Sequence, residues 1–407
     1  MGAMPWKEVL PMEERAKFVL RVKKAEESFA RLCREYAISR KTGYKWWSRF
    51  CEQGLEGLRE RSSRPWRSPR RSGVKWQEGV IQLRGRYPFW GPKKLRAKLE
   101  QTCRKGEVVP AASTLGMILQ RGGLARGRRR RGARPQIVRG VLREASGPNE
   151  IWAVDFKGWF RTGNGQRCDP LTISDLATRY VLCCRALEQQ SFALVYHVME
   201  GVFKIYGLPG RIRVDNGSPF AGRGAGGLSR LSVWWMRLGI GVEFITPGHP
   251  QENGSHERMH RTLKAETVYQ PAYNLTKQQH RFDRWRRYFN TERPHESLGQ
   301  QPPAKLYRSS TRTYSQQNEL LRPHYPQDWA VRRVRSNGEI RWRGHKRFIG
   351  EALVGELIGL HRLTPTQHAV YFMERLLGTL HDAEADFTGL RPTAYVLQNQ
   401  RNGEQKV

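Results

Sequence analysis

Two aspartates occupy predicted strand positions, where an acidic side chain is costly unless it has a chemical role, and a glutamate follows them on a predicted helix. Asp155 lies inside the apolar run 151–156, which predicts a buried strand, and Asp215 ends a second short strand. Glu257 falls in the first turns of a predicted helix. An acid in a buried strand destabilises the fold unless a metal ion or a charged partner compensates it. We therefore predict that these residues carry the function of the chain.

The chain has far more positive charge than solubility requires. Its 407 residues include 72 Lys and Arg against 37 Asp and Glu, which gives a formal net charge of +35. Residues 1–150 alone hold 36 basic against 14 acidic residues. This excess predicts a polyanionic partner, and we expect double-stranded DNA. The 38% of hydrophobic residues excludes wholesale disorder, and the length suits two to four domains.

The sequence gives no sign of a membrane protein or of a local zinc site. It has no apolar run long enough to span a bilayer, and no apolar signal segment near its start. We expect a cytoplasmic, nucleoid-associated protein with no membrane partner. The six cysteines form no CxxC pair, and no histidine precedes His197, so we expect reduced core cysteines and no zinc.

The first sixty residues predict a helix-turn-helix unit. Ser28 is expected to begin one helix, and Ser39 begins a second helix that Gly54 ends. The second helix is expected to bury four residues, Tyr44, Trp47, Phe50 and Cys51. It would present four basic residues to the major groove of DNA: Arg40, Lys41, Lys45 and Arg49.

A similar helical unit is predicted over residues 73–124, after a Ser/Arg/Pro-rich linker at 61–72. Trp90-Gly91-Pro92 begins a helix with Leu95 and Leu99 inward, and the segment 110–113 begins another. In that second helix, the expected inward residues are Leu115, Ile118 and Leu119, and the expected DNA contacts are Ser113 and Thr114. A helical bundle without DNA-binding activity has the same periodicity, and the charge favours DNA binding.

A basic linker is predicted over residues 125–146. The stretch from Arg121 to Arg134 holds seven arginines and no acid, so it cannot fold alone. A solvated tail and a localisation signal are the alternatives. Because folded segments flank this stretch, we favour a segment that follows the DNA backbone, with contacts from Arg128, Arg129, Arg130 and Arg131.

From Asn149 onward, the composition indicates a sheet. Residues 151–156, 171–175 and 180–184 predict the strands of a meander, and Phe192 to Tyr206 has helical periodicity. Four motifs in this region are Trp152-Ala153-Val154-Asp155-Phe156-Lys157-Gly158, Asp175-Leu176-Ala177-Thr178-Arg179-Tyr180, Val214-Asp215-Asn216-Gly217 and Pro250-Gln251-Glu252-Asn253-Gly254-Ser255-His256-Glu257-Arg258. With the segment from Tyr288 to Gly299, followed by Pro303-Ala304, they resemble bacterial insertion-sequence transposases of the retroviral-integrase superfamily.

The resemblance implies a ribonuclease-H-like α/β catalytic core over residues 147–308, with a mixed five-stranded sheet. It implies that Asp155, Asp215 and Glu257 form a DDE triad. The interval between Asp215 and Glu257 is longer than is usual in the family, and we expect the Gly-rich stretch 221–227 to absorb the excess as a loop. Glu252 competes for the third place, but a turn signal follows it, whereas Glu257 occupies the family's position.

Three carboxylates suit hard divalent cations, because Mg²⁺ and Mn²⁺ prefer oxygen ligands. Two such ions support phosphodiester cleavage and strand transfer, one at the attacking hydroxyl group and the other at the leaving oxygen. We therefore predict two Mg²⁺ or Mn²⁺ ions per active site. Arg261 and Lys264 are predicted to clamp the DNA ends, with ordinary surface charge as the alternative. Asp169 and Asp175 are expected to be structural acids, Asp175 with Arg179 as its partner.

The C-terminal part reads as short alternating strands. Residues 325–385 predict a small SH3-like β-barrel with a turn at Asn337-Gly338, and residues 386–407 predict a polar tail. Basic residues gather at one end of this barrel and would contact DNA or another protomer: Arg332, Arg333, Arg335, Arg341, Arg343, Lys346 and Arg347.

The motifs and the charge together predict a multidomain transposase. It would bind the terminal inverted repeats of a mobile element through its helical units, and catalyse metal-dependent strand cleavage and strand transfer into target DNA. We expect it to act as a homo-oligomer in a synaptic complex. The alternatives are a DNA-binding repressor or a catalytically inactive relic of such an element, and a structure-specific nuclease on the same core, against which the paired helical units argue.

Overall fold

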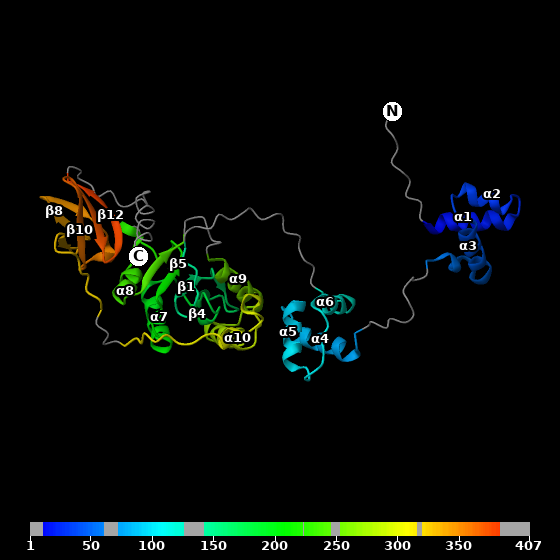
Figure 1. Ribbon diagram of the computed structural model, residues 1–407, viewed down its shortest axis with the longest axis horizontal. Coiled ribbons are helices and arrows are strands. Elements are labelled where there is room, and N and C mark those ends of the chain that lie inside the picture. Colours follow the sequence, from blue (N-terminus) through cyan, green and yellow to red (C-terminus); the bar gives the residue numbers. More distant parts are fainter. Residues whose placement is uncertain are drawn as a thin grey trace, which may run out of the picture. The chain divides into compact units, whose positions relative to one another are not determined.

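Figure 1 shows the computed structural model of the chain, which describes residues 11–60, 72–125, 142–222, 224–245, 253–315 and 320–382. The chain forms two compact units, residues 1–71 and 72–407, and each is described by itself. Several predicted features lie outside the described residues: the linker at 61–71, Arg128 to Arg131, Glu252 and the tail at 386–407. No helix in the described ranges has the length and apolar character needed to cross a membrane.

The first unit packs three helices around a small apolar core. The helices are α1 (Pro11–Lys24), α2 (Phe29–Glu35) and α3 (Arg40–Gln53), followed by the 3₁₀ turn η1 (Gly54–Leu58). Ser39 caps α3 by accepting a hydrogen bond from the backbone N–H of Thr42, and Gly54 ends it with a φ of 63°. Helix α1 was not predicted from the sequence. The core of the unit consists of Phe18, Val19, Leu32, Cys33, Trp46 and Leu58.

The predicted inward face of α3 is wrong for two of its four residues, Tyr44 and Cys51, whereas Trp47 and Phe50 are partly buried against the core. Gly43 and Trp46 are buried, whereas Tyr44 is 58% exposed and Cys51 is exposed. The cause is the close approach of α3 to α2 at Gly43, where an added Cβ atom would lie 2.7 Å from Cys33 Sγ. This contact turns Gly43 and Trp46 toward the core, and it leaves Tyr44 and Cys51 outside it.

The second unit begins with three more helices. They are α4 (Val74–Arg86), α5 (Pro92–Thr102) and α6 (Ala112–Arg121), and α4 was not predicted. Pro92 stands in the first turn of α5, and α6 begins after Ala111 without a side-chain cap, so Ser113 lies inside that helix. The predicted inward residues are all buried, and they pack with Val80, Tyr87 and Trp90: Leu95, Leu99, Leu115, Ile118 and Leu119.

A mixed sheet forms the centre of the second unit. Its strands are β1 (Ile151–Phe156), β2 (Phe160–Arg161), β3 (Arg167–Asp175), β4 (Val181–Leu187), β5 (Arg211–Val214) and β6 (Gly241–Phe244). The order is β4-β3-β1-β5-β6, in which β1, β3 and β4 form the predicted antiparallel meander and β5 and β6 run parallel to β1. The two-residue β2 pairs with the start of β3 and adds a sixth strand to the predicted five.

Helices cover both faces of this sheet (Figure 1). Helices α7 (Phe192–Tyr206) and α8 (Arg230–Arg237) pack on the face that carries Trp152 and Val154, and α8 was not predicted. Helices α9 (Gly254–Leu263) and α10 (Leu275–Thr291) pack on the opposite face, against Cys168 and Cys184. A π-helical turn, η4 (Lys264–Val268), continues α9, and short 3₁₀ turns η5 (Glu296–Leu298) and η6 (Pro303–Lys305) follow α10.

The C-terminal strands form two small sheets over one apolar core. Strands β7 (Ala330–Arg333), β10 (Leu357–Thr364), β11 (Gln367–Phe372) and β12 (Arg375–His381) form an antiparallel sheet of order β12-β11-β10-β7. Strands β8 (Glu339–Trp342) and β9 (His345–Phe348) form a separate hairpin, and η7 (Glu351–Leu353) leads to β10. The four-stranded sheet is open, so the predicted closure into an SH3-like barrel is not confirmed. Strand β9 was not predicted.

The prediction of a surface position is wrong for one arginine of this region, Arg347. Arg347 is 1% exposed, and its guanidinium group donates to the backbone carbonyls of His381 and Asp382. Its place on the short β9 turns the side chain inward, because alternate residues of a strand face opposite sides. The other six basic residues of that group are exposed, and Arg343 pairs with Asp382 at 2.6 Å.

The Gly-rich stretch 221–227 is not a free loop in its described part. Ala225 and Leu228 belong to the apolar core of the C-terminal sheets, and the backbone N–H of Ala225 donates to the carbonyl of Ile349 at 2.9 Å. Arg375 of β12 donates to the carbonyl of Gly226. The 3₁₀ turn η2 (Ala225–Gly227) therefore joins the C-terminal sheets to the central sheet.

Candidate active site

Asp155 and Asp215 are brought to the same edge of the central sheet. Asp155 is near the end of β1, and Asp215 follows the end of β5, which runs parallel to β1. Burial raises the pKa of Asp155 to about 7, with the Asp215 carboxylate as the next cause and Glu257 as a smaller one. The structure thus brings the three predicted acids within electrostatic reach of one another.

The turn after β5 holds Asp215 in place. Its Oδ1 accepts a hydrogen bond from the backbone N–H of Gly217 at 3.1 Å, and Asn216 Nδ2 donates to the carbonyl of Ile245 at 2.6 Å. An added Cβ atom at Gly217 would lie 3.1 Å from Asp215 Oδ2, so the glycine leaves room for the carboxylate. These contacts tie the turn to the end of β6.

Glu257 lies in the first turn of α9, with its side chain exposed. Asn253 stands at the N-cap of this helix, and Arg261 and Lys264 are exposed one and two turns after Glu257. Spacings of four and seven residues put the three side chains on one side of the helix. The two basic residues that the sequence singled out therefore stand on the same side as the third acid.

Lys157 is a basic neighbour of the acids that the sequence reasoning did not single out. Burial lowers the pKa of its ammonium group, and Lys264 lowers it further, whereas Asp155 and Glu257 raise it. Its position two residues after Asp155, just past the end of β1, is the signal that could have identified it. Positive charge therefore comes to the acids from the segment after β1 as well as from α9.

Two buried histidines of α9 bind the strand opposite Asp155. Thr172 is the partner of Asp155 in the pairing of β1 with β3. Its Oγ1 lies 2.8 Å from His256 Nε2 and 2.6 Å from His260 Nε2, and Ser174 Oγ lies 2.7 Å from His256 Nδ1. The sequence reasoning missed this cluster, although two histidines four residues apart in line with Met259 and Leu263 indicate an inward helix face.

Both imidazole rings of this cluster are neutral. Burial lowers the pKa of His256 to about 3, and burial with the neighbouring His256 and Lys157 lowers the pKa of His260 far below its usual range. Asp155, His256 and His260 each offer one ligand atom within 4.8 Å of the others. The closest approach of His260 to Asp155 is 3.7 Å, from Nδ1 to Oδ2.

The acids expected to be structural have protein partners. Asp175 is buried and accepts hydrogen bonds from the backbone N–H groups of Asn149 and Thr178, and from the Thr178 hydroxyl. Burial raises the pKa of Asp175, and Arg179 acts on it as a favourable neighbouring charge. Asp169 pairs with Arg167 at 2.6 Å. These acids belong to turns and strand ends.

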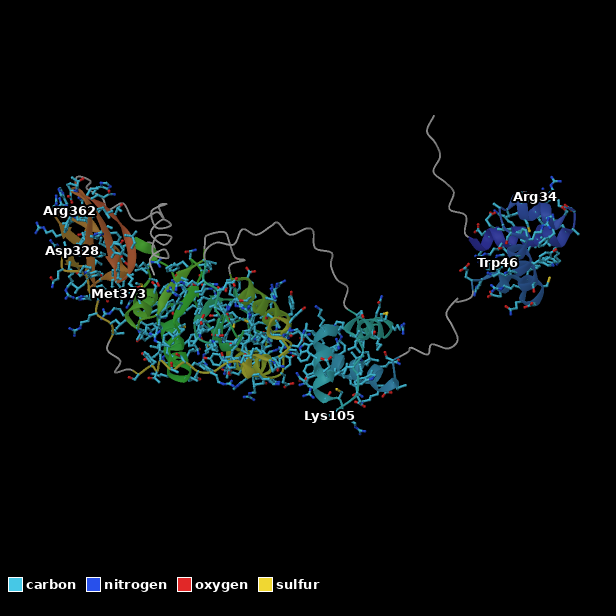
Figure 2. All side chains as sticks on the ribbon, in the orientation of Figure 1. Arg34, Trp46, Lys105, Asp328, Arg362 and Met373 are labelled. Atoms are coloured by element: carbon cyan, nitrogen blue, oxygen red, sulfur yellow. The ribbon has the colours of Figure 1, made fainter. Side chains whose placement is uncertain are left out.

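Two of the four predicted DNA-contacting residues of the first unit, Lys45 and Arg49, lie next to Trp46, which Figure 2 labels. Arg40, Lys41 and Lys45 are exposed, and Arg49 is half-buried. Lys45 Nζ and Arg49 Cζ stand 4.5 Å and 5.1 Å from the centre of the Trp46 ring. Three of the four residues therefore face solvent, and the fourth is partly covered.

In the second unit, the predicted contacts of α6 are less prominent. Ser113 is exposed and Thr114 is half-buried.

The three helices α4, α5 and α6 pack against the end of α10. Tyr288 lies against Trp90 and Tyr87, and the Tyr87 hydroxyl donates to Glu292 at 2.7 Å. Lys93 pairs with Glu296 at 2.5 Å. The segment from Tyr288 to Gly299 thus packs between the helical unit and the core.

Comparison with known families gives four matches along the chain. An integrase core domain matches residues 145–250, and a second form of it matches residues 238–303. A helix-turn-helix domain matches residues 14–65, and a homeodomain-like domain matches residues 42–119. The integrase matches include all three acids and the histidines of α9.

Two curated relatives come from bacterial insertion elements. An uncharacterized 39.2 kDa protein of insertion element IS476 from Xanthomonas euvesicatoria is 29% identical over 180 residues, 44% of this chain and 50% of that protein. An uncharacterized 31.7 kDa protein of insertion element IS407 from Burkholderia multivorans is 26% identical over 190 residues, 46% of this chain and 66% of that protein. The chain spans half to two thirds of the length of these relatives.

Among solved structures, the HTLV-2 integrase catalytic core domain in complex with magnesium is 15% identical, with a TM-score of 0.30. The match covers 42% of this chain and 100% of the HTLV-2 chain. The integrase core, the helix-turn-helix domains and the insertion-element relatives support the resemblance to insertion-sequence transposases of the integrase superfamily that the motifs indicate.

Proposed function

We propose that the chain binds the terminal inverted repeats of a mobile DNA element and catalyses metal-dependent strand cleavage and strand transfer. The observation that carries the proposal is the group of Asp155, Asp215 and Glu257 in an integrase core, with the pKa of Asp155 raised to about 7 by burial and by the other two acids. Negative charge held together at a sheet edge is characteristic of catalytic and metal-binding sites.

The donor set fits hard divalent cations. The three acids offer carboxylate oxygens, which Mg²⁺ and Mn²⁺ prefer, and the repulsion that raises the pKa of Asp155 is relieved when a cation binds. Two bound Mg²⁺ or Mn²⁺ ions would activate the attacking hydroxyl group and stabilise the leaving oxygen. Asp155, Asp215 and Glu257 are the residues that would hold them.

The basic residues of the chain supply the DNA contacts in this proposal. Arg261 and Lys264, on the Glu257 side of α9, bind phosphates of the element end next to the acids. The helical units and the basic segment 125–146 supply the sequence-specific and the backbone contacts. A homo-oligomer that pairs two element ends in a synaptic complex follows from the same chemistry, because each active site joins one end to target DNA.

Replacing Asp155 with Asn tests the proposal. We expect Asp155→Asn to abolish cleavage and strand transfer with Mg²⁺, while gel-shift affinity for the element end stays within about threefold of the unchanged chain, because affinity rests on the basic residues. Asp328→Asn, which makes the same charge change at an exposed position of the C-terminal region (Figure 2), is the matched control and should leave activity intact.

Two results would overturn the proposal. Retained cleavage in Asp155→Asn would show that the chemistry lies elsewhere. A chain that binds the ends tightly but cleaves no DNA with either Mg²⁺ or Mn²⁺ would be a DNA-binding repressor or a catalytically inactive relic.

A further inference from the structure

The hydrogen bonds around Thr172 define which nitrogen of each imidazole carries a proton. The Thr172 hydroxyl has one proton, and its Oγ1 donates to the backbone carbonyl of Asp155 at 3.0 Å. Its oxygen can then only accept from His256 Nε2 and His260 Nε2, so both rings carry their proton on Nε2. The Ser174 hydroxyl completes the set by donating to His256 Nδ1.

This assignment leaves His260 Nδ1 with a free lone pair. His256 uses both of its nitrogens in hydrogen bonds within the cluster, whereas the hydrogen bonds of His260 use Nε2 alone. His260 is 6% exposed, and its Nδ1 faces Asp155 Oδ2 at 3.7 Å. This lone pair and an ionised Asp155 carboxylate repel each other unless a proton or a positive ion lies between them.

We propose that His260 Nδ1 is a metal ligand that shares one divalent ion with Asp155 Oδ2, in addition to the three carboxylates. This inference rests on the proposed function, because it extends the ligand set of the same site. The 3.7 Å separation is compatible with one shared ion, since two atoms each about 2.1 Å from a metal are at most about 4.2 Å apart.

The competing arrangement is a hydrogen bond from His260 Nδ1–H to Asp155, with no direct bond between the imidazole and the metal. It requires the Thr172 hydroxyl to turn its proton away from the Asp155 carbonyl and toward His260 Nε2. It also requires a hydrogen bond across 3.7 Å, which exceeds the usual range for nitrogen and oxygen. The observed distances therefore favour ligation.

An imidazole ligand changes which ions the site prefers. Mg²⁺ and Ca²⁺ take oxygen ligands almost exclusively. Mn²⁺ also prefers oxygen but accepts an imidazole nitrogen more readily than Mg²⁺ does, and Co²⁺ and Zn²⁺ bind imidazole better still. The site should therefore favour these transition-metal ions over Mg²⁺ more strongly than three carboxylates alone would. Removing the imidazole should reduce Mn²⁺ affinity more than Mg²⁺ affinity.

The test uses the full chain, with Mn²⁺ as the probe and electron spin-echo spectroscopy as the readout. A nitrogen bonded directly to Mn²⁺ modulates the echo, and growth with ¹⁵N-labelled histidine changes the coupling if the nitrogen belongs to an imidazole. We expect this coupling in the unchanged chain and in His256→Gln, and its loss in His260→Gln. By calorimetry, His260→Gln should weaken Mn²⁺ binding by about tenfold or more, and Mg²⁺ binding by less than about threefold.

The outcomes separate this inference from the proposed function. Mn²⁺ that binds in an Asp155-dependent manner without histidine nitrogen coupling overturns the ligand assignment and leaves the carboxylate site standing. Coupling that His256→Gln removes while His260→Gln retains it would likewise overturn the assignment. Failure of the unchanged chain to bind Mn²⁺ at all would overturn both proposals. Because the first measurement is made on the unchanged chain, a variant that fails to fold does not obscure the result.

Discussion

At the residue scale, Asp155, a proposed metal ligand, lowers the stability of the fold when it is ionised. Its side chain is 24% exposed, and burial and the neighbouring acids raise its pKa from the ordinary value of 3.8 to about 7. The folded protein thus holds the Asp155 proton more tightly than the unfolded chain does. Ionisation of Asp155 therefore destabilises the metal-free fold.

This cost predicts a pH-dependent gain in stability for Asp155→Asn. Below about pH 4, Asp155 is protonated in both states and the cost is absent; it grows as the pH rises to about 7 and is complete above that. In EDTA at about pH 8, we expect Asp155→Asn to be more stable by on the order of 2 kcal/mol, and at about pH 5 by clearly less. Thermal unfolding at the two pH values measures this, and equal gains at both would contradict the electrostatic explanation.

At the element scale, the geometry of α9 favours Glu257 over Glu252 as the third acid of the proposed triad. The helix places Glu257 in its first turn, on the side of Arg261 and Lys264, and packs His256 and His260 onto β3. Residues five apart on a helix are separated by about 140° of rotation. Glu252, five positions before Glu257, would therefore not share its face even if α9 extended that far.

We therefore expect Glu257→Gln to eliminate turnover at saturating Mg²⁺, and Glu252→Gln to lose less than about tenfold, or roughly 1.4 kcal/mol of barrier. A pre-cleaved element end is the substrate of choice, because it isolates strand transfer from cleavage. Both variants make the same change of charge, so each serves as the control of the other. The reverse ranking of the two variants would assign the third acid to Glu252.

The elements that the sequence predicted are those that bury continuous or alternating apolar residues. The strands of the central meander and α7 appear where their apolar runs place them. Helices α1 and α4 and strand β9 were missed because polar and basic residues make up about half of each helix and most of the strand. The rotation of α3 depends on a contact between Gly43 and Cys33, which is a tertiary feature.

The site was predictable only in part, for a related reason. Asp155 and Asp215 stand out because an acid conflicts with the apolar strands that carry it, which a single sequence can reveal. Glu257 stands out only by its place in the motif that resembles the transposase family. The histidine cluster does not conflict with its surroundings, and its partner Thr172 lies 84 residues from His256 and 88 from His260. Only the packing of α9 on β3 brings these side chains together.

At the scale of the whole molecule, the division of the chain predicts where it can be cut. Residues 1–71 form their own compact unit, whereas α4 to α6 pack on Tyr288 and pair with Glu292 and Glu296. We expect deletion of residues 1–71 to weaken binding to element ends, and to leave hydrogen exchange in the remaining residues unchanged.

Deletion of residues 1–137 is the informative comparison. It removes Tyr87, Trp90 and Lys93 from the end of α10, so we expect faster exchange around Tyr288 and Glu292. The same measurement on both deletions separates loss of DNA contacts from loss of packing. Unchanged exchange in α10 after the longer deletion would show that the helical unit is not part of the fold of the core.

The docked turn at 225–227 also affects how related proteins can be recognised. Ala221 pairs with Leu228 as an isolated bridge, so the chain leaves and returns at nearly the same point, and Ala225 and Gly226 between them contact the C-terminal sheets. The interval between the two acids along the chain is thereby uncoupled from their separation in space. A search pattern that fixes this interval would pass over proteins of this kind, whereas one that lets it vary and requires both flanking motifs would find them.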